Sequence, residues 1–212
     1  MGLKERKERE KQARRQQIID AARSLLFEKG LQATSINKIA KRAELAVGTI
    51  YFYYSSKEAL FAELQEEGLQ LLMDNIQQAS SPVRDPKERL RTMAMAYYDF
   101  SCEHKDYFDI INYFLSSPNI LLSQNLKQHV DQRMEKILTF IDETLTRGVK
   151  EGVFRDNVQE SYGVLLLAAL HGLMQFRKFE STIFKGASHR TLYSKAVGHL
   201  LDGMDPKVTT VG

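Results

Sequence analysis

Helical periodicity is the feature of this sequence that most limits how the chain can fold. Apolar residues recur at intervals of three or four, the spacing of one helix face, as in Ile18, Ala22 and Leu25. No stretch shows the strand–helix alternation that is typical of a parallel sheet. Leu, Ala, Lys, Glu and Gln outnumber Val and Ile, and this composition favours helix over long windows. We therefore predict an all-α protein of about nine helices.

Turn and capping signals place the ends of these helices. Gly30 is expected to close the first periodic segment in a left-handed conformation. Thr34 or Ser35 can cap the next helix, and Ser55 or Ser56 can cap the fourth. The clearest break is "SSPVRDP", with two prolines. Helices are predicted from Gln16 to 29, then over 36–42, 47–54, 57–78, 86–103, 107–115, 121–151, 161–180 and 188–202.

Cysteine content and hydropathy limit the location of the protein. Cys102 is the single cysteine, so an internal disulfide is impossible and a reducing, cytoplasmic setting is expected. The charged N-terminus does not resemble a signal peptide. The longest apolar run, "GVLLLAALHGLM", is shorter than the roughly 18 residues that a membrane span requires. We therefore expect no membrane partner.

Charge is distributed unevenly along the chain. Residues 1–57 hold 13 Lys and Arg against 6 Asp and Glu, whereas the remainder has more acidic than basic residues. A basic N-terminal part on an acidic body indicates a polyanionic partner at one end. A solvated charged tail is the alternative, and for residues 1–11 alone it is the preferred interpretation.

The stretch "LAVGTIYFYYSSKEAL" concentrates four aromatic residues before a Ser-Ser break. The stretch contains the third of three predicted helices. Together the three have the spacing of a helix-turn-helix unit. Ile36, Ile39 and Ala40 of the second helix are expected to pack on Ile18, Ala22 and Leu26, with Ile50 also inward. The other residues of the third helix then lie on its outer side and rim. The second helix of such a unit enters the major groove of DNA.

The segment "TSINKIAKRAELAVGTIYFYYSSKEALFAEL" resembles the DNA-binding domain of the TetR family of bacterial transcriptional regulators, continuously from about Gln16 to Leu64. The resemblance includes the Ile-Ala pair, the Gly-Thr-Ile-Tyr start of the third helix, the aromatic cluster and Ser-Lys-Glu. It implies DNA contacts by residues at the start of the second and third helices and at the phosphate rim. These are Ser35, Ile36, Asn37, Ala46, Val47, Gly48, Thr49, Tyr51, Phe52, Tyr53 and Lys57.

The segment departs from the family pattern at three positions. Glu44 stands where the family usually has Gly, so its backbone is expected to tolerate an unfavourable conformation. Tyr54 replaces an apolar ring, and its hydroxyl needs a partner if it is buried. Val47 replaces an often polar residue, so apolar and backbone contacts are expected to matter more in base recognition. For Tyr53 and Tyr54 the sequence leaves packing and DNA contact equally open, and Asn37 is not expected to contact a base directly.

The family resemblance implies five segments: a charged extension (1–15), a helix-turn-helix DNA-binding domain (16–57), a connecting fourth helix (58–80), a helical ligand-binding and dimerisation domain (81–204) and a flexible tail (205–212). The stretch around 162–176 is apolar nearly all round, as expected of a helix buried on more than one side. A homodimer through the last two long helices is expected to use Tyr162, Leu166, Ala169, Leu173, Phe176, Leu192, Ala196 and Leu200.

Aromatic, methionine and polar residues of the body are candidates for an effector pocket, although each is also typical of an ordinary core. They are Met93, Tyr97, Phe100, Phe108, Tyr113, Phe114, His171, Met174 and Gln175. The sequence therefore predicts a ligand-responsive repressor that binds a palindromic operator as a homodimer. A small hydrophobic or aromatic effector is expected to release it.

The sequence contains no nucleophile motif, phosphate loop or convincing carboxylate pair, so we expect no enzyme and no cofactor. Cys102 and His104 lie close in sequence, but two such residues do not make a metal site, and no metal is expected. Two alternatives stay open: a helical scaffold whose helix-turn-helix binds protein, and an all-helical enzyme. The basic excess of residues 1–57 argues against the first.

Overall fold

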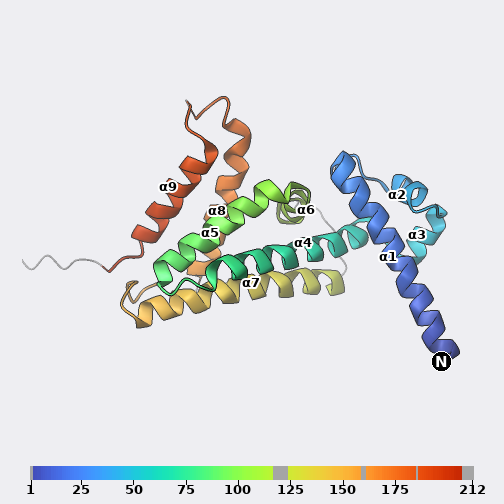
Figure 1. Cartoon of the computed structure of the whole chain (residues 1–212), viewed down its shortest axis with the longest axis horizontal. Helices are drawn as coiled ribbons and strands as arrows, with labels where there is room; N and C mark the ends of the chain where they lie inside the picture. Colours follow the sequence, from blue (N-terminus) through green and yellow to red (C-terminus); the bar gives the residue numbers. More distant parts are fainter. Residues whose placement is uncertain (1, 117–123, 159–160, 185, 207–212) are drawn as a thin grey trace, which may run out of the picture. The chain divides into compact units, whose positions relative to one another are not determined.

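A computed structural model describes residues 2–116, 124–158, 161–184 and 186–206, and these residues form helices and turns without a strand (Figure 1). The all-α prediction is confirmed. No helix in this described part is both long enough and apolar enough to cross a bilayer. The elements are α1 (Leu3–Lys29), α2 (Ile36–Arg42), α3 (Val47–Tyr53), α4 (Lys57–Ser80), α5 (Pro86–Glu103), α6 (Lys105–Ser116), α7 (Gln124–Lys150), α8 (Tyr162–Gln175), the 3₁₀ helix η1 (Phe176–Phe179) and α9 (His189–Asp202).

Helix α1 begins at Leu3, whereas the apolar period predicted its start at Gln16. The added turns carry almost no apolar residue, so periodicity could not detect them. They are held by local polar contacts: the Gly2 amide donates to Glu5 at 3.0 Å, and Arg6 pairs with Glu10 at 2.9 Å. Capping contacts and pairs spaced by four residues stabilise a helix that has no face to bury.

The other helix limits agree with prediction to within a few residues, and α5 has the predicted bounds. The exception is the helix predicted to reach residue 180, because α8 ends at Gln175 and the 3₁₀ helix η1 follows it. The predicted start of the long helix at Leu121 lies outside the described residues, as does most of the predicted tail. Two compact units make up the chain: residues 1–70 with 104–131, and residues 71–103 with 132–212. Helices α4 and α7 each contribute residues to both units.

The core of the first unit joins α1, α2, α3, α4 and α6. Ile18, Ile39, Ile50, Leu64 and Ile110 are all fully shielded from solvent in this cluster. Phe27 and Tyr107 meet edge to face with ring centroids 5.2 Å apart. Burial of one stripe from each short helix supplies stability that α2 and α3, of seven residues each, would lack in isolation.

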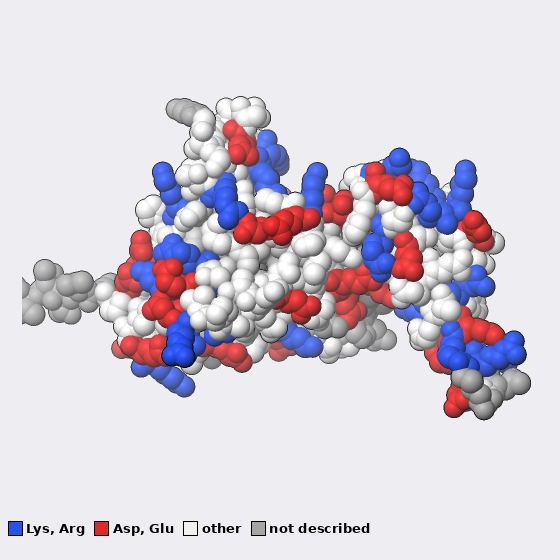
Figure 2. All heavy atoms as spheres, in the orientation of Figure 1, with Lys and Arg blue, Asp and Glu red and all other residues white. Residues whose placement is uncertain are grey.

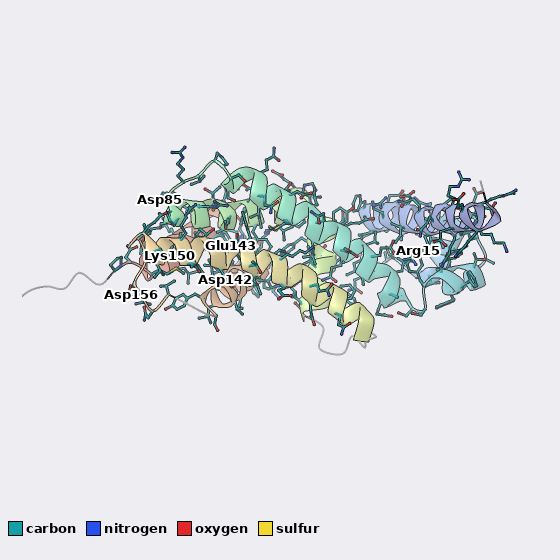
Figure 3. All side chains as sticks on the ribbon, turned by 90° about the horizontal axis from the view of Figure 1, so that it is seen from below. Arg15, Asp85, Asp142, Glu143, Lys150 and Asp156 are labelled. Carbon is teal, nitrogen blue, oxygen red and sulfur yellow. The ribbon has the colours of Figure 1, made fainter. Side chains whose placement is uncertain are left out.

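The second unit buries the large rings of Phe100, Phe154 and Tyr193, and the Tyr193 hydroxyl donates to the Ala94 carbonyl at 3.1 Å. Lys87 of α5 pairs with Asp205, which follows α9, at 2.6 Å. Asp142 of α7, labelled in Figure 3, accepts a hydrogen bond from the backbone N–H of Gly163 near the start of α8. Partial burial raises the pKa of the Asp142 carboxyl, and this hydrogen bond opposes the rise.

Candidate nucleic-acid interface

The helix-turn-helix unit packs as the sequence predicted. Ile36, Ile39 and Ala40 share one buried cluster with Ile18, Ala22, Leu26 and Ile50. The structure decides between the alternative capping residues of α2 and of α4. Ser35 accepts from the Lys38 amide at 3.4 Å, and Ser56 accepts from the Ala59 amide at 3.0 Å. The Thr34 hydroxyl instead donates to the Gly30 carbonyl at 2.9 Å and helps to close the turn.

The two turns of the unit use positive φ angles. Gly30 has φ 74° but ψ 171°, so its φ is positive as expected while its ψ is extended rather than left-handed helical. Glu44, between α2 and α3, has φ 54°. This agrees with the expectation of an unfavourable backbone there, since a non-glycine residue in this region costs about 1–2 kcal/mol. Gln17 of α1 donates to the adjacent Ala43 carbonyl at 2.7 Å and helps to hold the turn.

Helix α3 has one buried apolar side chain and several exposed ones. Ile50 is fully buried, whereas Phe52 is 79% exposed, Tyr51 51% and Val47 37%. A Cβ atom built on Gly48 would meet no atom within 4 Å, so the backbone there is open on its outer side. The core does not explain why these positions carry large rings and a glycine. An external surface fitted closely against α3 would explain both.

The four rings of the stretch lie in different environments. Tyr54 is buried, and its hydroxyl donates to Glu63 at 2.8 Å, which supplies the partner that the sequence required. Arg15, labelled in Figure 3, donates to the same carboxylate at 2.7 Å and lies over the Tyr54 ring. Burial and the Glu63 carboxylate raise the pKa of Tyr54. Tyr53 is half-buried and meets Phe52 edge to face, so Tyr54 packs inward and Tyr53 lies at the rim.

Lys57 lies in the first turn of α4, where the helix dipole disfavours a cation. Its ammonium group sits 4.8 Å from the centroid of the Phe61 ring, which offsets part of this penalty. Arg42 is held by Glu28 at 2.6 Å, and this pairing lowers the pKa of the Glu28 carboxyl to about 2. Lys41 is exposed on α2. Figure 2 shows Lys and Arg side chains gathered over this end of the first unit.

The structure separates the predicted DNA-binding residues by exposure. Asn37, Ala46, Val47, Gly48, Tyr51 and Phe52 are exposed, while Ser35, Thr49, Tyr53 and Lys57 are half-buried. Ile36 is buried in the core, so its side chain does not face outward. Sequence reasoning did not identify the Arg15–Glu63–Tyr54 contact, which fixes the end of α3 to α1 and α4.

Comparison with known proteins agrees with this geometry. Residues 18–64 match the family model described as bacterial regulatory proteins, tetR family. The helix-turn-helix segment of the chain belongs to this family. It is 25% identical to the fatty acid metabolism regulator protein of Bacillus subtilis over 150 residues, which cover 71% of this chain and 75% of that protein. It is 27% identical to the transcriptional repressor KstR2 of Mycobacterium tuberculosis over 146 residues, which cover 69% and 72% of the two chains.

Solved structures share the fold of this chain over most of their length. The TetR-family regulator PfmR from Thermus thermophilus has a TM-score of 0.63 and 25% identity, with 89% of this chain and 99% of that chain covered. AibR, solved with isovaleryl coenzyme A and operator DNA, has a TM-score of 0.67 and 18% identity, with 89% and 98% covered. These matches show that the chain shares the fold of these regulators.

The nine pocket candidates are divided between the two units. Met93, Tyr97, Phe100 and Met174 are buried in the second unit. His171 bonds to the Tyr97 hydroxyl at 2.7 Å and to Gln175 at 3.3 Å, and burial lowers its pKa. The other three candidates belong to the first unit, and one of them, Phe114, packs against the core of that unit. They are Phe108, Tyr113 and Phe114.

The apolar helix α8 places its leucines on two sides. Leu166 is buried within its own unit, so its predicted place on a dimer surface is not available without rearrangement. Phe176 of η1, a predicted dimer residue, is 55% exposed. Val164 and Leu165, which were not among the predicted dimer residues, are 51% and 61% exposed. Tyr162 accepts from Arg155 at 2.9 Å. The remaining predicted dimer residues are half-buried: Ala169, Leu173, Leu192, Ala196 and Leu200. Among the described residues no cluster of three or more His, Cys, Asp and Glu could hold a metal ion.

Proposed function

We propose that this protein is a ligand-responsive repressor that binds a palindromic operator as a homodimer. One observation carries the proposal: α3 exposes Val47, Tyr51 and Phe52 and an open Gly48, although Ile50 is its only buried side chain. A helix placed in the major groove needs such a face, with small residues for close approach and apolar atoms for thymine methyl groups.

The roles follow from exposure. Val47, Gly48 and Thr49 lead α3 into the groove, and Ala46 allows close approach at its start. Tyr51 and Lys57 donate to phosphates, while Phe52 and Tyr53 line the rim and Asn37 lies toward the backbone. Ser35 and Ile36 act indirectly, since one caps α2 and the other anchors it in the core.

The dimer in this proposal forms through α8 and α9. The sequence of α8 contains no charged residue, yet Val164 and Leu165 are more than half exposed in the single chain. Burying such a surface against its own copy gives a two-fold interface and places two α3 helices in successive major grooves, about 34–36 Å apart. A palindromic operator then has the same two-fold symmetry as the dimer that binds it.

We propose a hydrophobic effector, and acyl-CoA thioesters are the first class to test. AibR and a regulator FadR of Bacillus subtilis are described in complex with isovaleryl coenzyme A and stearoyl-CoA respectively. The buried side of this chain's body is rich in aromatic and methionine side chains, which suit an acyl group. An effector releases DNA only if it binds the released state more tightly than the bound state.

A gel-shift titration on the protein's own upstream region tests the proposal. We expect sequence-specific binding that weakens steeply with salt, at a stoichiometry of one dimer per half-site pair. Addition of acyl-CoA thioesters of increasing chain length should release the DNA, with free coenzyme A as the control. Absence of specific binding there and in a genome-wide selection of binding sites would contradict the repressor assignment.

A further inference from the structure

The N-terminal turns of α1 carry a line of cations that the helix-turn-helix unit does not use. Lys4, Lys7, Lys11 and Arg14 follow one another at steps of three and four residues, so they share one face of the helix. The same steps continue to Ile18, Ala22 and Leu25, which are buried in the core. A stripe of this kind drifts only about 20° per seven residues. The cations therefore lie on the side of α1 that faces α2, α3 and α4.

The lysines of this stripe are free for an external partner. No ion pair or hydrogen bond joins Lys4, Lys7 or Lys11 to another side chain in the part of the chain that the structure describes, and all three are exposed. The acidic residues of the same turns are engaged elsewhere. Glu5 accepts from the Gly2 amide, Glu8 from Gln12 and Glu10 from Arg6. Only Glu10 pairs with a cation, Arg6, and residues 4–14 hold six cations against three carboxylates.

The stripe ends beside the end of the proposed recognition helix. Arg15, the residue after the stripe's last cation, lies with its guanidinium 4.9 Å from the centroid of the Tyr54 ring, and Tyr54 directly follows α3. From this point α1 extends past α2 and α3 for several turns (Figure 1). Figure 2 shows both Lys or Arg and Asp or Glu side chains at this N-terminal end.

We infer that the stripe is a second DNA-binding surface, which follows the phosphate backbone beside each operator half-site. Residues 3–14 span roughly 18 Å as helix, and this matches about five base pairs of a duplex at 3.4 Å each. A row of lysines on a rigid helix suits a row of phosphates, because ammonium groups bind them as point charges without base preference. The inference rests on the proposed function, and it adds contacts to flanking DNA that α3 does not reach.

The chain supplies its own matched control for this inference. Lys7→Gln with Lys11→Gln removes two charges from the stripe. Arg6→Gln with Arg9→Gln removes two charges from other faces of the same turns. Glutamine has a helix propensity similar to that of lysine and arginine, so both variants should stay helical by circular dichroism. Equilibrium binding is then measured from low to moderate salt on an operator with 10 flanking base pairs on each side.

The stripe variant should reduce the slope of log K against log salt by about 1.8 per protomer, since each lost phosphate contact contributes about 0.9. The control variant should change the slope by less than half as much. On a duplex trimmed to the footprint of the helix-turn-helix units, wild type and stripe variant should bind alike.

Equal losses in the two variants would overturn the inference, because they would mean a diffuse charge effect without a directed face. An unchanged difference on the trimmed duplex would also overturn it. Failure of the wild type to bind any operator is a different result, and it would remove the proposed function itself. Binding of the stripe to anionic vesicles but not to flanking DNA would replace DNA by a membrane surface.

Discussion

Helices α3 and α8 both expose apolar side chains that their own cores do not need, but the two surfaces differ in chemistry. The face of α3 combines aromatic rings with an open glycine, and Lys57 and Lys41 lie on the helices adjacent to it in sequence. The exposed face of α8 is aliphatic, and no residue of that helix is charged. A polyanion with grooves fits the first surface, whereas only another apolar surface fits the second. Exposed apolar area alone does not identify a partner, but the groups around it do.

The polar side chains of helix α4 also differ between its two sides. The Tyr54 hydroxyl has a charged partner, because Glu63 accepts from both Tyr54 and Arg15. On the same helix α4, Gln65 is fully buried and neither atom of its amide has a hydrogen-bond partner in the described structure. One side of α4 is therefore locked to the DNA-binding unit, while the other carries an unsatisfied polar group.

The largest effect is expected when a charge is placed on the exposed face of α8, and the same change on α3 should have a different result. Leu165→Glu places a charge on the exposed face of α8 and should weaken dimer formation by about 3–5 kcal/mol, since an unpaired charge would be buried. Light scattering should show a monomer that keeps its helical circular dichroism. The equivalent change on α3, Val47→Glu, should leave the dimer intact and remove operator binding. A dimeric Leu165→Glu protein would contradict the proposed interface.

Gln65→Met tests the unsatisfied amide on α4. Methionine has a similar volume and no polar atom to satisfy, so the free energy of unfolding should rise by about 1–3 kcal/mol. Urea unfolding of the variant and of the exposed control Gln78→Met measures the difference, and the control should lie within about 0.5 kcal/mol of wild type. A destabilised Gln65→Met protein would show that the amide has a partner in solution.

Gly48→Ala should act in opposite directions on folding and on DNA binding. A methyl group at this position meets no protein atom, and alanine favours a helix over glycine by about 0.5–1 kcal/mol. Stability should therefore rise. Operator affinity should fall about tenfold, which corresponds to roughly 1.4 kcal/mol, because the methyl group obstructs close approach to DNA. Unchanged affinity would place Gly48 away from the groove.

Glu44→Gly is expected to have the smallest effect. The positive φ of Glu44 costs about 1 kcal/mol more than glycine would, so thermal unfolding should shift upward by a few degrees. Operator affinity should be nearly unchanged, because the turn keeps its geometry. Weaker DNA binding in this variant would indicate that the glutamate itself takes part in recognition.

Sequence patterns predicted the parts of this fold that local chemistry decides. Pro86 and the preceding break fixed the start of α5, and the turn between α2 and α3 required the positive φ of Glu44. Tertiary contacts were not predictable in the same way. The Glu63 partner of Tyr54 lies on another helix. In a segment that is apolar on every face, the sequence pattern does not show which side is buried, so it could not distinguish buried Leu166 from exposed Leu165. The N-terminal turns of α1 were missed because they bury nothing.

The central claim is that the outer face of α3 and the start of α4 hold DNA. The direct test is the double variant Tyr51→Phe with Lys57→Ala, compared with the exposed control Lys136→Ala in an equilibrium titration on the operator. The account predicts about a hundredfold loss of affinity from two lost phosphate contacts, a salt slope lower by about 0.9 per protomer, and an unchanged dimer. Operator binding as tight as that of the wild type, with the same salt slope, would contradict it.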